Sequence, residues 1–150
     1  MEAEHLPKTV KELVQWMKNH CYNFESYSIG GNSIYEGFGL EETLDGYMWY
    51  YTERGQRTRV AFFATEQAAV QHAYQQVAAD KWATAHYVGL TAKQAETQEL
   101  AERLQALGVR FWQDIIPGFY GAQRPAYRTF VTGCDINRAG FLKQRYYHKP

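Results

Sequence analysis

The pattern of hydrophobic and polar positions divides the chain into helix-like and strand-like stretches. Between residues 7 and 21 the apolar side chains recur at the i, i+3, i+4, i+7 spacing of an amphipathic helix. They are Val10, Leu13, Val14 and Met17. Thr9 and Glu12 have the spacing of a capping box, in which two side chains satisfy free backbone N–H groups, so this helix is predicted to begin near Thr9.

The stretch 46–63 is typical of a β-hairpin, because two aromatic, β-favouring runs flank a short polar segment. Gly55 supplies the positive φ that a tight connection needs, which places Glu53 and Arg54 at the turn with their charges outward or in a local pair. Alternation along the first run puts Tyr47, Trp49 and Tyr51 on one face and Met48, Tyr50 and Thr52 on the other. Neither face is plainly polar, so helices or loops are expected over much of both.

The remaining pattern predicts further strands and helices around this hairpin. Strands are expected on both sides of a turn at residues 30–33, at about 84–88, at 109–116 and at 127–132, with a long loop at 117–125; helices are expected at 66–80, 91–107 and 137–147. Thr65 is the expected cap of the first of these helices, Thr91 with Gln94 that of the second, and Gly108 its end.

These elements predict a single α+β domain spanning residues 1–150, with an antiparallel sheet of about five to seven strands packed with about four helices. The strands of the last third belong either to the same sheet or to a small second sheet.

Charge and composition narrow the classes of partner. Sixteen basic residues balance sixteen acidic ones, so no net field attracts the chain to nucleic acid or to an anionic membrane, and neither is expected as a partner. The aromatic content of 16% suits half-buried sheet faces and recognition surfaces alike. No stretch approaches the roughly 20 apolar residues of a spanning helix, and residues 1–5 lack the basic, then apolar order of a secretion signal. A cytoplasmic location is therefore expected.

The central stretch also carries a sequence motif. Its order is an aromatic run, Tyr-Tyr-x-Glu-Arg-Gly and Phe-x-x-Glu-x-x-Ala, formed by Tyr50, Tyr51, Glu53, Arg54, Gly55, Phe63, Glu66 and Ala69. This order resembles a pattern of small immunity proteins from bacterial polymorphic-toxin and contact-dependent growth inhibition systems. The resemblance implies a protein that binds a cognate toxin domain and occludes its active site or substrate path. It also implies no catalysis and no cofactor of its own.

Two groups of residues are candidates for toxin contact. Four carboxylates, Glu36, Glu41, Glu42 and Asp45, stand within ten residues before the hairpin and could complement a cationic cleft. An ordinary solvated strand end is the alternative interpretation. The long loop carries Phe119, Tyr120 and Arg124, whose types are frequent among interface hot spots, although such a loop could equally fold down over the sheet.

An enzymatic or ligand-binding alternative uses Glu53, Arg54 and His86 as the acid, base and cation of a ribonuclease-like site. The spacing does not require it, and a structural adaptor is a third possibility. The five histidines, His5, His20, His72, His86 and His148, are scattered, so no metal site is expected. The Gly-rich turn at 30–33 lacks the following Lys-Ser or Lys-Thr of a phosphate-binding loop.

Overall fold

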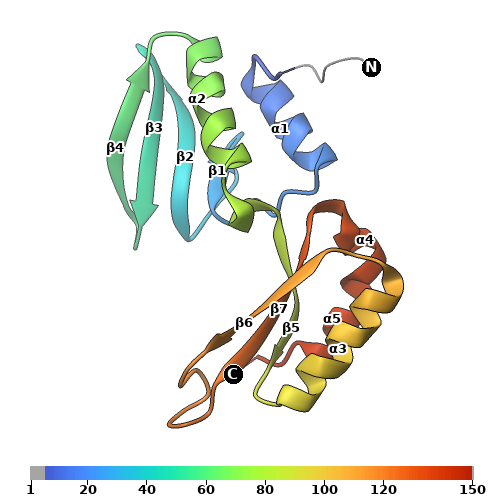
Figure 1. The fold of residues 1–150 in the computed structure, drawn as a ribbon. Helices are drawn as coiled ribbons and strands as arrows, with labels where there is room; N and C mark the ends of the chain where they lie inside the picture. The colour runs from blue at the N-terminus through green and yellow to red at the C-terminus, as the bar shows by residue number, and fades with distance from the viewer. Residues whose placement is uncertain (1–5, 150) are drawn as a thin grey trace. The chain divides into compact units, whose positions relative to one another are not determined.

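A computed structural model describes residues 6–149 (Figure 1). The chain divides into two compact units, Met1–Thr84 and Ala85–Pro150, each with its own sheet. The predicted α+β class is confirmed, and the strands of the described residues form one sheet of four strands and one of three. The last strands of the chain thus form a second sheet. That all 150 residues make one domain stays a prediction.

The first unit is a four-stranded sheet with two helices. Its elements are α1 (Val10–Asn19), β1 (Tyr27–Ile29), β2 (Glu36–Thr43), β3 (Gly46–Glu53), β4 (Gln56–Phe63), α2 (Glu66–Ala78) and the 3₁₀ helix η1 (Lys81–Thr84). The strand order is β1-β2-β3-β4. The last two pairings are antiparallel, whereas β1 runs parallel to β2. The connection at residues 30–35 therefore carries the chain back along the sheet, and Gly30 and Gly31 begin it with φ of 84° and 93°.

Trp49 lies at the centre of the core of this unit. Helices α1 and α2 pack on one face of the sheet (Figure 1), where Trp49 is only 2% exposed. Its ring stacks on Phe38 at 5.6 Å between centroids and meets His72 of α2 edge-on at 5.4 Å. The face that carries Tyr47, Trp49 and Tyr51 is therefore the inner face. Burial of its apolar side chains stabilises the packing of the sheet against the helices.

Side-chain caps begin both helices of this unit, as the sequence predicts. The hydroxyl of Thr9 accepts a hydrogen bond from the backbone N–H of Glu12 at 3.1 Å, and that of Thr65 accepts from Ala68 at 3.3 Å. Each hydroxyl satisfies one of the N–H groups that a helix start leaves without a partner. The Glu12 carboxylate accepts from the N–H of Lys8 at 2.8 Å, one residue earlier than in a regular capping box.

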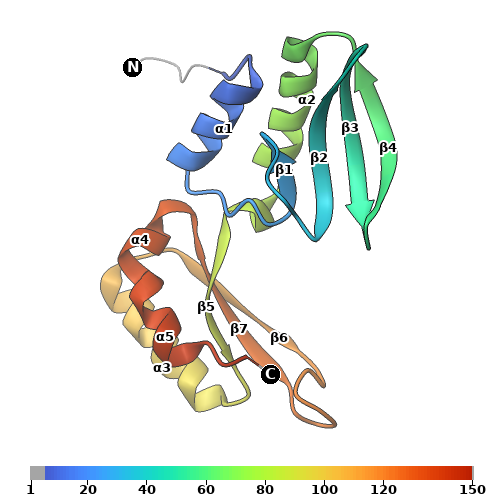
Figure 2. The same ribbon diagram turned by 180° about the vertical axis from the view of Figure 1, so that it is seen from behind.

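The second unit is a three-stranded antiparallel sheet with helices on one side (Figures 1 and 2). Its elements are β5 (Ala85–Thr91), α3 (Gln94–Leu107), β6 (Phe111–Ile116), β7 (Ala126–Thr132), η2 (Gly133–Asp135), α4 (Ile136–Ala139), η3 (Gly140–Leu142) and α5 (Lys143–Tyr146). The strand order is β5-β7-β6. Its core includes Val88, Leu100, Leu104, Val131, Leu142 and Tyr146. Gly108 ends α3 with a φ of 70°, as predicted.

Two local predictions for this unit are wrong. Thr91 does not cap α3, because Lys93 occupies the N-cap position and its side chain makes no capping hydrogen bond. The expected helix at 137–147 is broken into α4 and α5 by the 3₁₀ turn η3. The buried residues Ala139, Leu142 and Tyr146 still recur three and four positions apart, so a helical spacing of apolar residues does not ensure continuous α-helical hydrogen bonding.

Candidate functional site

The motif turn is a two-residue hairpin connection between β3 and β4. Arg54 and Gly55 both have positive φ, 53° and 78°, which is the sign pattern of a type I′ turn and confirms the role predicted for Gly55. Glu53 and Arg54 are exposed. His86 lies in β5 of the other unit. Neither unit by itself therefore contains the full catalytic set of the enzymatic alternative.

The motif tyrosine Tyr51 makes a hydrogen bond to Glu36, the first residue of β2. Its hydroxyl donates to Glu36 Oε1 at 2.7 Å, and this hydrogen bond to a carboxylate is the main cause that raises the pKa of Tyr51 to about 12. Glu53 lies opposite Glu36 in the strand register, so two carboxylates flank the phenol. This contact links the hairpin motif to the predicted acidic cluster.

The acidic cluster does not form one patch. All four carboxylates are exposed, but Glu36 and Glu42 pair with inner-face residues of β3, whereas Glu41 pairs with Met48 on the opposite face. Asp45 stands in the turn between β2 and β3. Only Glu41 is therefore placed on the face that α1 and α2 leave uncovered, which we call the outer face.

The outer face carries basic and aromatic side chains of β3 and β4 together with Glu41. Its residues are Glu41, Met48, Tyr50, Thr52, Arg57, Arg59 and Phe62. A register shift opposite Trp49 and Tyr50 makes a β-bulge in β4. The bulge adds one residue to β4, so Arg59 and Phe62, three positions apart, share this face. The sequence predicts helices or loops over much of both faces of the sheet. This prediction is wrong for the outer face of β4, since Arg57, Arg59 and Phe62 are all exposed.

Arg57 is held by two contacts, which we call the Arg57 clamp. Its guanidinium lies over the ring of Tyr50, 4.4 Å from the centroid, and its Nη1 donates to Glu41 Oε2 at 2.6 Å. The side chains of Arg57 and Glu41 remain 53% and 47% exposed. Beside the clamp, Arg59 lies 4.9 Å from the ring centroid of Phe62. The clamp thus presents a cation in a fixed orientation to solvent.

A hollow of about 270 Å³ opens on the outer face beside the clamp. Its walls are Ser28, Gly31, Asn32, Ser33, Ile34, Leu40, Glu41, Tyr50, Thr52 and Arg57. Tyr50 is only 4% exposed, although its strand position points away from the helices. Its ring lies across Gly39, where a Cβ atom would stand 2.3 Å from the Tyr50 hydroxyl oxygen. Glycine at position 39 is therefore what allows the ring to lie flat on the sheet.

Asn32 fixes the loop that forms the opposite wall. Its Oδ1 accepts from the N–H of Ile29 at 2.9 Å, and its Nδ2 donates to the carbonyls of Tyr27 at 2.9 Å and Phe24 at 3.2 Å. The Ser28 hydroxyl donates to the Asn32 carbonyl at 2.5 Å. These bonds give the loop a defined shape, so the hollow has a fixed wall.

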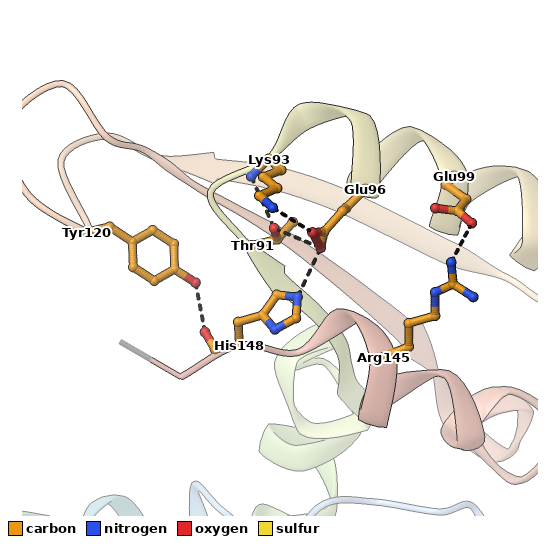
Figure 3. A network of polar contacts seen from close by, with 7 residues as sticks. All are labelled: Thr91, Lys93, Glu96, Glu99, Tyr120, Arg145 and His148. Carbon is orange, nitrogen blue, oxygen red and sulfur yellow. Dashed lines mark hydrogen bonds and ion pairs between the residues drawn. The ribbon is translucent and has the colours of Figure 1, made fainter.

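The three loop residues predicted for toxin contact are brought together in the second unit. The rings of Phe119 and Tyr120 meet edge-on at 5.0 Å, and the Arg124 guanidinium lies 5.9 Å from the Tyr120 ring centroid. Tyr120 donates its hydroxyl hydrogen to the carbonyl of His148 at 2.8 Å (Figure 3). Phe119 and Arg124 remain exposed. These residues belong to the second unit, whereas the outer face belongs to the first.

His148 anchors the C-terminal segment beside β5. Its N–H donates to the carbonyl of Leu90 at 2.8 Å, and its Nε2 lies 2.9 Å from Glu96 Oε2 (Figure 3). The Thr91 hydroxyl also donates to that oxygen at 3.2 Å, and Lys93 Nζ lies 3.9 Å from the other one. Burial alone would raise the pKa of Glu96, but the hydrogen bonds from His148 and Thr91 outweigh it and lower this pKa.

These residues line a hollow of about 240 Å³ in the second unit, together with Ala92, Tyr120 and Arg124. A carboxylate, an imidazole and two cations thus meet there, which are groups that acid–base chemistry uses.

The sequence gives little signal for this cluster, because Glu96 and His148 lie 52 positions apart. Arg57 had a clearer signal, since Arg57 and Arg59 alternate with less polar residues on an expected strand.

Among residues 6–149, no group of three or more His, Cys, Asp or Glu side chains could hold a metal ion. His5 lies outside the described residues, as does the 1–5 segment considered for a secretion signal. No helix of the described part combines the length and the apolar character that crossing a membrane requires.

No family model, curated protein or solved structure matches this chain.

Proposed function

We propose that the protein is an immunity protein, which binds a cognate bacterial toxin domain and blocks the active site or substrate path of that domain. The resemblance of residues 46–69 supports this class. The observation that carries the proposal is the Arg57 clamp, an exposed guanidinium held on Tyr50 and Glu41 within the stretch that bears the resemblance. On this proposal the protein acts in the cytoplasm of the toxin-producing cell, without a cofactor.

The chemistry of the outer face suits tight binding to another protein. Arg and Tyr are enriched among the residues that carry most binding energy at interfaces. Because Arg57 is already held, a partner does not have to immobilise it, which saves about 0.5–1.5 kcal/mol for such a side chain. Exposed charges of both signs, Glu41 beside Arg57 and Arg59, would select a partner with the complementary arrangement.

The other residues predicted for toxin contact fit this proposal in different ways. Glu42 pairs with an inner-face residue and Asp45 lies in the β2–β3 turn, so these exposed carboxylates would meet a partner only at that end of the sheet. Glu36 is engaged by Tyr51. Phe119, Tyr120 and Arg124 form a second candidate contact in the other unit. We take the outer face as the principal contact and these positions as secondary ones.

The immunity function predicts a toxin-like domain encoded next to this gene, and that domain is the partner used in the test. Calorimetry with that domain should show binding by the wild-type chain and at least tenfold weaker binding by Arg57→Ala, as expected for a hot-spot residue. Lys11→Ala, which removes an exposed cation from α1, is the control and should bind like wild type. Equal affinity of folded Arg57→Ala and wild type would remove the outer face as the contact. No binding to the neighbouring domain would contradict the immunity function.

A second candidate, an acid–base enzyme, is favoured by one specific observation, the meeting of Glu96 and His148 with Lys93 and Arg124 in one hollow. It is a different set from Glu53, Arg54 and His86, the groups expected from the sequence, which stay an untested alternative. The second candidate requires that the purified chain turn over a substrate, for example RNA, and that His148→Ala abolish turnover. The immunity proposal expects no turnover. It also expects that the His148→Ala variant protects cells from the toxin as well as the wild-type protein does.

A further inference from the structure

We propose that the hollow beside Tyr50 binds a carboxamide side chain, Asn or Gln, of the partner protein. This inference rests on the proposed function, because the partner supplies the occupant. It names the chemistry that the outer face recognises.

The first observation is the hydroxyl of a buried tyrosine, which lacks a hydrogen bond. Tyr50 is 4% exposed and lines the hollow, yet its hydroxyl makes no hydrogen bond to any residue between 6 and 149. The hydroxyls of buried tyrosines usually have a partner. Among the described residues the buried side-chain atoms without a partner are Trp16 Nε1 and Thr97 Oγ1, so the Tyr50 hydroxyl is accessible from the hollow, where it can bond a ligand atom.

The position of the ring directs this hydroxyl into the hollow. Gly39 lies between Ser28 and Tyr50 in the register of β1, β2 and β3. Because the Tyr50 hydroxyl oxygen lies above Gly39, the ring extends from β3 across β2, toward the loop that forms the opposite wall. The Asn32 hydrogen bonds hold that wall in place before a ligand arrives.

The charges of the hollow favour a neutral occupant. Arg57 and Glu41 are ion-paired at its edge, so the guanidinium and the carboxylate compensate each other. An anion would be placed near the Glu41 carboxylate, and a cation near the Arg57 guanidinium, each at an electrostatic cost. A neutral polar group avoids both penalties.

The hydrogen-bonding groups select a carboxamide among neutral groups. A guanidinium has five N–H donors, and the contact with Glu41 uses one Nη1 donor of Arg57. With the hydroxyls of Tyr50 and Thr52, the remaining donors can serve a carbonyl oxygen. The second oxygen of Glu41 can accept from an amide N–H₂. A carboxamide offers both halves, an acceptor oxygen and two N–H donors.

Acetamide is the probe for this site. NMR spectra of the full chain, with labelled tyrosine and glycine, should show saturable shifts of the Tyr50 ring and the Gly39 amide. Tyr50→Phe keeps the ring and removes the hydroxyl, and should weaken acetamide binding about five- to tenfold, the size of one neutral hydrogen bond. Tyr127→Phe, the same change in the second unit, should bind acetamide as wild type does. Acetate and methylguanidinium should bind more weakly than acetamide.

Three results would overturn the inference. They are the absence of a saturable shift with acetamide in folded wild-type chain, equal shifts in Tyr50→Phe, and tighter binding of acetate or methylguanidinium. The source of the carboxamide is tested with the neighbouring toxin domain, whose binding Tyr50→Phe should weaken by a similar factor. Acetamide binding with unchanged toxin binding by Tyr50→Phe would overturn the assignment of the occupant to the partner. Because the acetamide titration does not involve the toxin, failure of the pocket and failure of the immunity function are distinguishable.

Discussion

The hydroxyl of Tyr51 donates a hydrogen bond to the carboxylate of Glu36, with 2.7 Å between Oη and Oε1. This contact joins β3 to the first residue of β2, next to the turn that carries the motif. A phenol that donates to a carboxylate loses its proton less readily, because the phenolate would face a second negative charge.

We expect Tyr51 to titrate with a pKa of about 12 and the Glu36→Gln variant to lower this pKa toward the ordinary value of about 10. Because the folded-state pKa is raised, the contribution of this contact to stability is present below pH 10. It is lost as the pH rises from about 10 to 12. A ¹³C NMR titration of the tyrosine rings measures this pKa, with Tyr51→Phe assigning the resonance. The same titration midpoint in Glu36→Gln and wild type would show that the Glu36 carboxylate does not raise the pKa of Tyr51.

Trp49 is the largest side chain of the first core and is 2% exposed. We expect Trp49→Ala to lower the free energy of unfolding by about 3–5 kcal/mol, because the truncation loses buried area and leaves a cavity between sheet and helices. Urea denaturation followed by circular dichroism measures this difference. Tyr35, which is 82% exposed, supplies the control, since Tyr35→Ala should change stability by no more than about 0.5 kcal/mol. Equal stability of the two variants would contradict the central position of Trp49.

Gly39 and Tyr50 should be energetically coupled. A Cβ on residue 39 would stand 2.3 Å from the Tyr50 hydroxyl oxygen, so Gly39→Ala must displace the ring, at an expected cost of about 1–3 kcal/mol. In the Tyr50→Ala background the same change should cost much less, which a double-mutant cycle by urea denaturation measures. Gly140→Ala is the control, because the nearest atom to its Cβ is 3.7 Å away and φ is −59°. Additive costs at positions 39 and 50 would show that the ring does not lie across Gly39.

Glu96 should contribute to the pH dependence of stability in the acid range. Its pKa is lowered, so the contribution is present above the ordinary value of about 4.3 and is lost as the pH falls through the folded-state value. We therefore expect the stability difference between wild type and Glu96→Gln to narrow in acid. Thermal unfolding between about pH 3 and 7 measures it. Glu102→Gln, an exposed carboxylate change on the same helix, is the control, and a pH-independent gap for Glu96→Gln would contradict the prediction.

Elements set by local chemistry could be predicted from the sequence. Gly55 fixes the hairpin turn, Thr9 and Thr65 cap their helices, and Gly108 ends α3, because each effect depends on neighbours within a few residues. The division of the acidic cluster was also predictable. Strand alternation alone separates Glu41 from Glu36 and Glu42.

The candidate site depends on contacts between residues far apart in the sequence. Glu41 and Arg57 are 16 positions apart and meet across β3. β1 pairs parallel with β2, whereas the sequence predicts an antiparallel sheet, because side-chain alternation in a strand does not indicate the direction of the neighbouring strand. Ring placement over Gly39 likewise required the strand register. Periodicity gives the face of a residue, and it does not give the partner of that residue.

The Arg57 clamp should matter more for binding than for folding. Arg57→Lys keeps the charge but loses the planar fork that both lies on Tyr50 and reaches Glu41. Because the ion pair is about half exposed, we expect a loss of no more than about 1 kcal/mol in unfolding free energy. Affinity for the neighbouring toxin domain should fall about tenfold, because the lysine must be ordered on binding. Arg110→Lys, at an exposed ion pair of the second unit, should alter neither property measurably. Denaturation and calorimetry on the same preparations separate the two effects, and a stability loss without an affinity loss would make the clamp a structural contact only.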